Sequence, residues 1–297
     1  MQEIGQALDT PDDVVFDDLQ RAAFPDQALG RAVLGTAERV SSFDRNALKT
    51  YMSDHYRAPR MVLSAAGNID HQAIVRQATE AFSGLPGSDQ DDVCPPAVYA
   101  GGDQRRSKAL EQAHVLLGFK GIAYNDPDYY ALHVASTVFG GGMSSRLFQE
   151  VRETKGLAYS IYCYGSSYRD GGLFGIYAGT AGEKVNELTA VVASEAAKLC
   201  DKAEEAEVVR ARAQLKAGIL MSLESSSSRC EQIAKQMLIY DRVVPAAELI
   251  EAIDNVDTSA VESVMGRIIG SGELAVAAIG PIEQLESYDR LSARFGS

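Results

Sequence analysis

Histidine is the first residue type to consider for metal or proton-transfer chemistry, because an imidazole binds zinc and titrates near neutral pH. The chain of 297 residues contains four histidines. They are His55, His71, His114 and His133. No two of them lie three to five residues apart, which is the spacing that places two imidazoles on one helix face around a zinc ion. The sequence therefore has no local two-histidine metal site, and we expect these side chains to be structural.

Motifs for covalent and phosphate chemistry are also absent from the sequence. There is no Gly-x-Ser-x-Gly segment, so a serine-hydrolase elbow is not supported. The run Gly140-Gly141-Gly142 lacks the Gly-Lys-Ser/Thr ending of a phosphate-binding loop, and a tight turn between two helices is the simpler interpretation. The four cysteines form no Cys-x-x-Cys pair, which is typical of reduced thiols in a cytoplasmic protein.

The composition of the chain limits the classes of partner that it can bind. The chain has 28 Lys and Arg against 41 Asp and Glu, a formal net charge of −13. Nucleic acids and anionic membrane surfaces both require a basic surface, so we expect neither as a partner. No stretch approaches the roughly 18 apolar residues of a membrane span. The first residues resemble no export signal, so we expect a cytoplasmic protein.

Hydrophobic spacing and capping residues predict the elements that must position any functional group. Thr10 and Pro11 begin a helix that should end near Phe24. Met61–Gly67 is an apolar run of strand length, for which we predict a buried strand. The other predicted elements are helices at 44–55, 71–82, 129–139, 144–154, 185–199 and from 208, a helix capped by the serines at 225–228, a strand at 114–119 and a hairpin of 158–164 with 173–178.

The sequence contains similar segments at a constant offset of 213 residues. This offset separates Asp44 from Asp257 at the start of a helix, and Phe82 from Phe295. The apolar run Met61–Gly67 falls on Leu274–Gly280 at the same offset. We therefore predict that residues 1–84 are the C-terminal part of one unit, residues 85–103 a linker and residues 104–297 a complete second unit. Chance similarity between two generic helix-strand-helix segments is the alternative.

Several segments together resemble one family of enzymes. They are Gln2–Ile4, Thr10–Phe16, Leu29–Gly35, His55–Met61, Phe139–Phe148 and Arg152 with Gly156–Ser160. In this order they are similar to motifs of the pitrilysin, insulinase and mitochondrial processing peptidase family of zinc peptidases. The resemblance implies an α+β fold of two homologous units, each a mixed or antiparallel sheet flanked by helices, with the first unit incomplete at its N-terminus. The units of this family close around a peptide chamber.

The resemblance also implies roles for three residues. Glu3 matches the third zinc ligand of the family, and Arg152 and Tyr159 match a pair that reaches the bound peptide. A guanidinium donates in a planar fork to a carbonyl or carboxylate, and a phenol can donate to a developing oxyanion. The alternatives are a solvated Glu3, a surface ion pair at Arg152 and a packed Tyr159. The His-x-x-Glu-His motif that holds zinc is nowhere in the sequence, so zinc is expected in a full-length parent and not in this chain by itself.

The resulting functional hypothesis is the C-terminal portion of a zinc-dependent metalloendopeptidase that is inactive by itself. Its substrate would be a peptide or an unfolded protein, and we expect a homodimer or pairing with a metal-bearing subunit. A non-catalytic partner or scaffold subunit of the same family is the alternative. An unrelated α+β binding protein is the third hypothesis.

Overall fold

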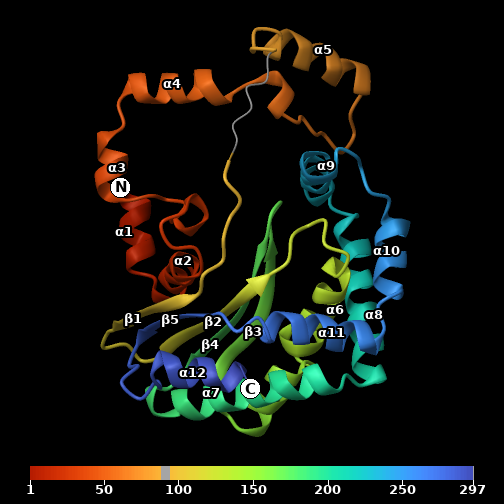
Figure 1. The fold of residues 1–297 in the computed structure, drawn as a ribbon. Coiled ribbons are helices and arrows are strands. Elements are labelled where there is room, and N and C mark those ends of the chain that lie inside the picture. The colour runs from red at the N-terminus through yellow and green to blue at the C-terminus, as the bar shows by residue number, and fades with distance from the viewer. Residues whose placement is uncertain (88–93, 297) are drawn as a thin grey trace. The chain divides into compact units, whose positions relative to one another are not determined.

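The computed structural model describes residues 1–87 and 94–296, which form two compact units. The sheet unit comprises Met1–Thr36, Pro96–Leu215 and Glu251–Ser297. The helical unit comprises Ala37–Pro95 and Lys216–Ile250. Figure 1 shows how segments that are distant in the sequence contribute to each unit.

A mixed five-stranded sheet organises the sheet unit. The strands stand in the order β1-β5-β2-β4-β3, with β1 parallel to β5 and the other neighbours antiparallel. Helices flank this sheet, so the predicted α+β class with a mixed sheet and flanking helices is confirmed. The predicted hairpin is present as β3 and β4. The strands are β1 (Gly102–Ser107), β2 (Ala113–Gly121), β3 (Ala158–Ser167), β4 (Gly172–Thr180) and β5 (Leu274–Gly280).

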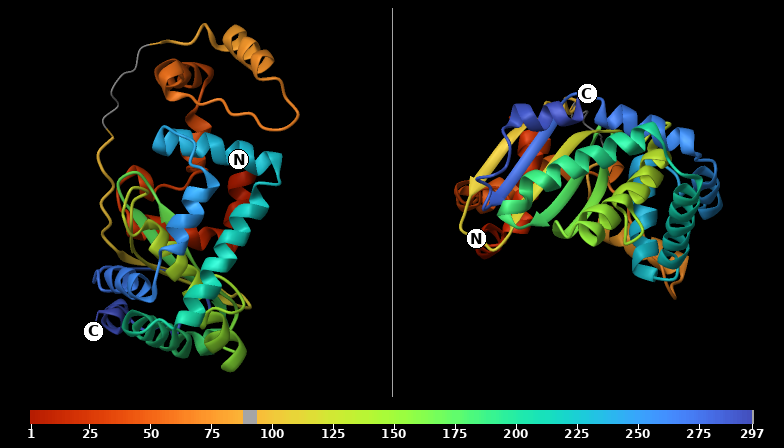
Figure 2. Two further views of the ribbon diagram at one scale, coloured as in Figure 1. Left: turned by 90° about the vertical axis from the view of Figure 1, so that its right-hand side faces the viewer. Right: turned by 90° about the horizontal axis from the view of Figure 1, so that it is seen from below.

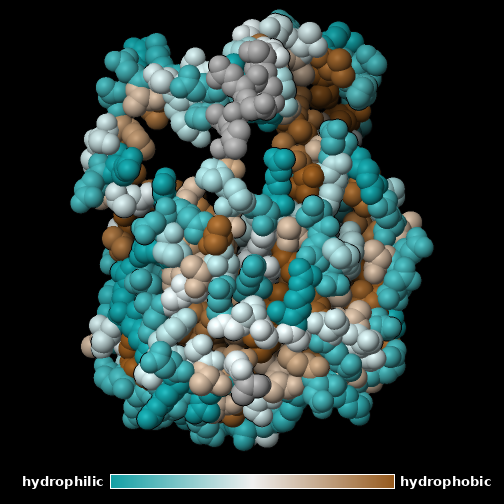
Figure 3. Space-filling view, in the orientation of Figure 1, coloured by the Kyte–Doolittle hydropathy of each residue, from teal (hydrophilic) through white to brown (hydrophobic). Residues whose placement is uncertain are grey.

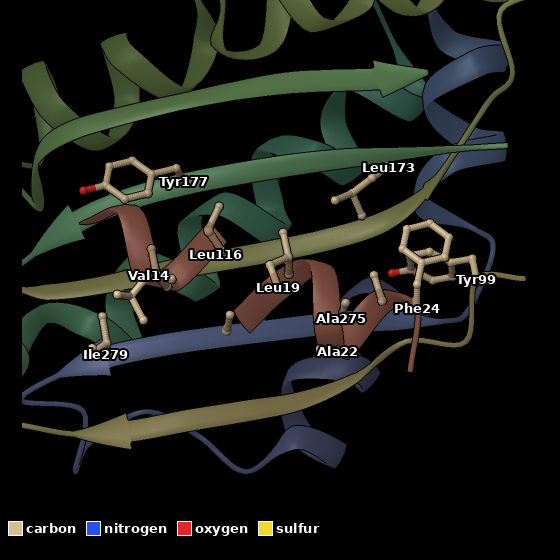
Figure 4. Packing of buried hydrophobic residues seen from close by; sticks show 13 residues of the cluster. Val14, Leu19, Ala22, Phe24, Tyr99, Leu116, Leu173, Tyr177, Ala275 and Ile279 are labelled. Atoms are coloured by element: carbon tan, nitrogen blue, oxygen red, sulfur yellow. The ribbon is translucent and has the colours of Figure 1, made fainter. Parts of the chain in front are cut away.

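Helix α2 (Pro11–Ala23) covers one face of the sheet, as Figure 4 shows. Pro11 suits the first helical turn because its missing N–H has no partner to lose there. Leu19 is fully buried against the sheet. At the end of the helix Phe24 packs edge-on against Tyr99, with the ring centroids 5.7 Å apart. The predicted helix from Thr10 to Phe24 is therefore confirmed.

The opposite face of the sheet is covered by four helices, which lie in front of it in the right-hand view of Figure 2. Because both faces are covered, every residue of β4 and β5 is buried. None of the helices in the described residues is long and apolar enough to cross a membrane. The covering helices are α6 (Tyr129–Gly140), α7 (Val185–Asp201), α11 (Thr258–Ile269) and α12 (Tyr288–Phe295).

The remaining elements are mostly short or belong to the helical unit. Ser225 caps α9 by accepting a hydrogen bond from the Ser228 backbone N–H, as the serine run predicted. Helices α8 and α10 have residues in both units. The elements are α1 (Gln2–Leu8), α3 (Ala37–Ser42), α4 (Arg45–His55), α5 (His71–Phe82), α8 (Glu205–Ser222), α9 (Ser226–Tyr240), α10 (Ala246–Asp254), and the 3-10 turns Ala28–Gly30, Ala58–Arg60 and Gly182–Lys184.

The predicted buried strand at Met61–Gly67 is wrong for this structure. The segment has no regular secondary structure, and Met61, Val62 and Leu63 are exposed. A strand forms only where a neighbouring strand pairs with its backbone, and within residues 1–87 and 94–296 none lies beside this segment. Ser64 instead bonds to α9, where its hydroxyl donates to the Cys230 carbonyl over 2.8 Å.

The predicted linker at 85–103 is described only in part. Residues 88–93 lie outside the described residues. Towards its C-terminal end Tyr99 is buried in the sheet unit and donates to the Gly118 carbonyl over 2.8 Å. Gly102 begins β1. The division of the chain into two homologous units stays a prediction.

Two histidines should make the stability of the sheet unit sensitive to mild acid. Burial lowers the pKa of His133, whose ring lies edge-on to Tyr129 at 4.6 Å, and burial also lowers the pKa of His114. As the pH falls through about 6.5, unfolded histidines bind protons that the folded protein binds only at lower pH, so the free energy of unfolding falls. Urea unfolding at pH 7 and below should show this loss. The free energy of unfolding should fall less steeply with falling pH in the His133→Gln variant. An unchanged slope in that variant would contradict the assignment.

Candidate functional site

Arg152 lies in a π-helical turn that follows the glycine run. The predicted helix at 144–154 is present as two α-helical residues, 146 and 147, followed by a π-helix at Phe148–Thr154. The Thr154 hydroxyl donates to the Gln149 carbonyl five residues back, over 2.9 Å. Turns of this kind are rare and often occur at functional sites.

The Arg152 side chain is held at the surface by local contacts. Its guanidinium carbon lies 4.7 Å from the centre of the Phe148 ring, and its Nε lies 3.8 Å from a Glu153 carboxylate oxygen. The side chain is 45% exposed. An exposed ion pair of this length stabilises little, whereas stacking on a ring leaves the edge of a guanidinium open to a ligand. These contacts therefore orient the Arg152 side chain and leave it exposed to solvent.

A short turn connects Arg152 to β3. Gly156 takes a φ of +58°, which a residue with a side chain adopts at a cost. The Leu157 N–H donates to the Val151 carbonyl over 2.8 Å, and the buried Thr180 hydroxyl donates to the Leu157 carbonyl over 2.5 Å. Lys184 Nζ donates to the Gly156 carbonyl over 2.9 Å. These hydrogen bonds fix where β3 begins.

Tyr159 is the extra residue of a β-bulge at the start of β3. The pairing with β4 shifts between Ala158 and Ser160, and the Tyr159 side chain is 69% exposed. A β-bulge turns a side chain out of the alternating pattern of a strand, and bulges are common near active sites. In the described part of the chain, β3 is an edge strand that pairs with β4 only. The bulge thus presents a phenol beside a free strand edge.

Arg152 and Tyr159 both belong to the stretch where the π-helical turn packs against β3. Both side chains face solvent, and among the described residues no hydrogen bond or ion pair joins them. Both donors are therefore exposed to an external acceptor group.

An aromatic row next to the bulge was not singled out from the sequence. Tyr162 lies 5.0 Å and Phe16 5.7 Å from Tyr177, measured between ring centroids. The Tyr177 hydroxyl hydrogen-bonds to Nδ1 of His114 at 2.8 Å, and burial raises the pKa of Tyr177 to about 12. Tyr164 also packs against Phe16, at 5.6 Å. The alternating tyrosines of β3 were the available signal, but the rings from β2, β4 and α2 join them only through the fold.

The glycine run is a tight turn, as predicted from the sequence. A Cβ on Gly140 would lie 2.7 Å from the Cys163 backbone nitrogen, and one on Gly141 would lie 2.5 Å from Thr137 Cα. These close approaches let α6 end directly against β3, and they place the π-helical turn that carries Arg152 beside that strand.

Glu3 lies in the first turn of α1, and its side chain is exposed. Within the described residues, no group of three or more His, Cys, Asp or Glu side chains could hold a metal ion. A zinc site needs about three protein ligands, and Glu3 is a single carboxylate. The described residues therefore do not fit a zinc site by themselves.

Comparison with known proteins places the chain among peptidases and their relatives. A family described as "Peptidase M16 inactive domain" matches residues 42–215. An "Uncharacterized zinc protease" of Rickettsia bellii is 37% identical over 95% of this chain and 68% of the relative. A "Probable mitochondrial-processing peptidase subunit beta" of Arabidopsis thaliana is 35% identical over 99% of this chain, which spans 58% of that protein.

The fold is also found in a solved structure. A chain of "Complex III2 from Candida albicans, Inz-5 bound" matches with a TM-score of 0.88 and 24% identity, over 99% of this chain and 72% of that chain. At this identity the match shows the fold and no more.

Proposed function

The chain belongs to the M16 peptidase family, and from that premise we propose that it supplies the peptide-binding part of a zinc-dependent peptidase and cleaves no peptide by itself. Its relatives carry the names zinc protease and mitochondrial-processing peptidase subunit beta. The matching family is described as an inactive domain. These descriptions support a binding role in which the catalytic residues come from another polypeptide segment.

The exposed donors beside the open edge of β3 are the observation that carries this proposal. An extended peptide can pair with a free strand edge through backbone hydrogen bonds. Arg152 then donates to a peptide carbonyl or carboxylate, because its guanidinium stands on Phe148 with an edge open to solvent. Tyr159 donates its phenol to a peptide carbonyl oxygen, and more strongly to the oxyanion that forms as the bond is attacked.

Zinc enters this proposal through residues that lie outside the given sequence. Glu3 is the ligand that these 297 residues offer, and a His-x-x-Glu-His segment of a full-length parent or of a metal-bearing subunit supplies the rest. When zinc is bound in such a complex, it lowers the pKa of a bound water so that hydroxide forms near neutral pH. The residues of this chain bind and orient the peptide.

A non-catalytic partner or scaffold subunit is the second candidate. It is favoured by the description of the matching family as an inactive domain. In that role the chain pairs with a metal-bearing subunit or with a second copy, and Arg152 and Tyr159 are ordinary surface residues. The two candidates differ in whether a peptide binds at these residues.

Peptide binding to the isolated chain distinguishes them. We expect a short fluorescent peptide without regular structure to bind, as measured by fluorescence anisotropy, and Arg152→Ala to weaken binding about tenfold, which corresponds to roughly 1.4 kcal/mol. Arg169→Ala is the matched control, because Arg169 is an exposed arginine in the turn between β3 and β4. Equal affinities for the two variants would contradict the proposed role. Stoichiometric zinc retained by the isolated chain at a site containing Glu3 would contradict the need for a partner.

A further inference from the structure

The two faces of β3 present different side chains to a peptide that pairs with its open edge. Ile161 and Cys163 are buried, and the Cys163 thiol donates to a backbone carbonyl of α6 over 3.0 Å. Tyr162 and Tyr164 alternate with these residues along the strand, so they point to the opposite face, on which α2 lies. The ring of Tyr164 lies 5.6 Å from that of Phe16 on α2, which agrees with this assignment.

Tyr162 is the exposed member of the aromatic row. Tyr177 pairs with it across β3 and β4, and the two ring centroids are 5.0 Å apart. Tyr177 is 7% exposed, on the side of the sheet that carries α2, whereas Tyr162 is 40% exposed (Figure 4). Tyr164 lies over Gly175, where a Cβ would clash with its ring. Tyr177 therefore supports the Tyr162 ring on one side, and the rest of that ring is open to a ligand.

Tyr162 lies close to the bulge that presents Tyr159. Ser160 follows Tyr159 at the bulge, and Tyr162 is two residues further along β3. A strand rises about 3.3 Å per residue, so these two positions lie about 7 Å apart along the strand. A peptide whose carbonyl accepts from Tyr159 thus places a side chain beside Tyr162 about two residues along. The neighbouring peptide residues point to the α6 side of β3, because side chains alternate between the faces.

Asp12 limits the charge of the side chain that fits beside Tyr162. Burial raises the pKa of Tyr162 and of Tyr177, and the carboxylate of Asp12 lies close enough to raise both further. Asp12 is an exposed residue in the first turn of α2. Like charges repel at this range, so an acidic peptide side chain is disfavoured beside Tyr162, whereas an uncharged ring has no such cost.

The surrounding surface offers less to an apolar side chain than the rings do. Figure 3 shows hydrophilic and intermediate residues over most of the visible face of the sheet unit, with smaller hydrophobic areas between them. A pair of tyrosines gives a further aromatic ring a contact of defined geometry, with ring centroids about 4.5–7 Å apart. Aromatic pairs on neighbouring strands also stabilise their pairing.

We propose that Tyr162, supported by Tyr177, is a specificity-determining residue that selects an aromatic side chain in an extended peptide paired with β3. The selected residue lies about two positions from the peptide carbonyl that Tyr159 binds. Its ring packs against Tyr162, and an acidic side chain at the same position is rejected because of Asp12. The inference rests on the proposed function, because it requires a peptide at the edge of β3.

A host peptide of alanine and serine with one central guest residue tests this preference on the full chain. The guests are phenylalanine, alanine, glutamate and lysine, and fluorescence anisotropy measures each affinity. We expect the phenylalanine guest to bind about fivefold more tightly than the alanine guest, which corresponds to roughly 1 kcal/mol. The glutamate guest should bind more weakly than the alanine guest. Equal affinities for phenylalanine and alanine would overturn the inference, and so would a lysine guest that binds as tightly as phenylalanine.

Variants of the chain locate the contact. In Tyr162→Ala the ratio between the phenylalanine and alanine guests should fall below about two, whereas Tyr162→Phe should keep it, because the aromatic contact needs no hydroxyl. Val209→Ala, at an exposed residue of α8 in the sheet unit, is the control and should also keep the ratio. A purely structural role of Tyr162 would change both affinities alike. The same ratio in Tyr162→Ala and Val209→Ala would overturn the inference.

Tryptophan as the guest gives a second readout that needs no label. The chain contains no tryptophan, so its emission reports only the peptide. Binding should shift this emission to shorter wavelength, and the shift should be smaller in Tyr162→Ala. No shift on binding to the unmodified chain would contradict packing against the ring.

Failure of this inference differs from failure of the proposed function. If every guest binds alike and Arg152→Ala still weakens binding about tenfold, the peptide site stands and the selection by Tyr162 is wrong. If no guest peptide binds the chain, the proposed function and this inference are both overturned.

Discussion

Replacing Tyr159 with Phe should lower peptide hydrolysis by a complex of this chain with a zinc-bearing partner by 10²–10³-fold. This loss corresponds to about 2.7–4 kcal/mol, the usual cost of removing one hydrogen-bond donor from a developing oxyanion. The change removes one hydroxyl from an exposed side chain, so folding should be unaffected. The turnover number should fall while the Michaelis constant changes little, because the hydrogen bond strengthens only as charge develops.

Tyr168→Phe is the control for this variant. Tyr168 lies in the turn between β3 and β4, and its hydroxyl is 3.4 Å from the Gln20 amide nitrogen, a long hydrogen bond. Its removal should leave hydrolysis unchanged. If Tyr159→Phe turns over peptide as fast as Tyr168→Phe does, Tyr159 plays no part in the reaction.

Replacing Leu19 with Ala should lower the free energy of unfolding by about 2–5 kcal/mol. Leu19 is fully buried between α2 and the sheet, and a Cβ built on Gly118 would lie only 3.0 Å from its Cδ1 atom. Packing this tight leaves a cavity when the side chain is shortened. Urea unfolding followed by the near-ultraviolet circular dichroism of the tyrosines measures the loss.

Leu8→Ala is the matched control, because Leu8 is an exposed leucine on the neighbouring α1. Its effect should stay within about 0.5 kcal/mol. A similarly small effect for Leu19→Ala would mean that the packing of α2 on the sheet contributes little to stability. The contacts of Phe16 with the aromatic row would then contribute little to holding that row in place.

The sequence predicted those elements whose signals are local. Pro11 and Phe24 bound α2, Ser225 caps α9, and two strand-length segments on either side of a turn mark the hairpin of β3 and β4. Each depends on residues a few positions apart. The side on which α2 packs was not predictable, because its partners Leu116, Tyr177 and Ala275 are far away in the sequence.

The candidate site shows the same difference between local features, which the sequence predicted, and long-range contacts, which it did not. The family resemblance implied a shared role for Arg152 and Tyr159, but it did not indicate the π-helical turn or the bulge that exposes the phenol. The hydroxyl of Thr180, on a strand later in the chain, donates to the Leu157 carbonyl just before the bulge, and this contact is not visible in the local sequence. Met61–Gly67 was mispredicted for a related reason, since its apolar sequence favours a strand and the described residues offer it no neighbour.

The most direct test of the central claim is peptide hydrolysis measured with zinc for three samples: the chain by itself, the portion of the Rickettsia bellii relative that has no counterpart in this chain by itself, and the two together. The account predicts hydrolysis only in the combined sample, with loss of activity in Arg152→Ala and Tyr159→Phe. Hydrolysis by the chain by itself would contradict it, and so would full activity of the combined sample when both residues are replaced.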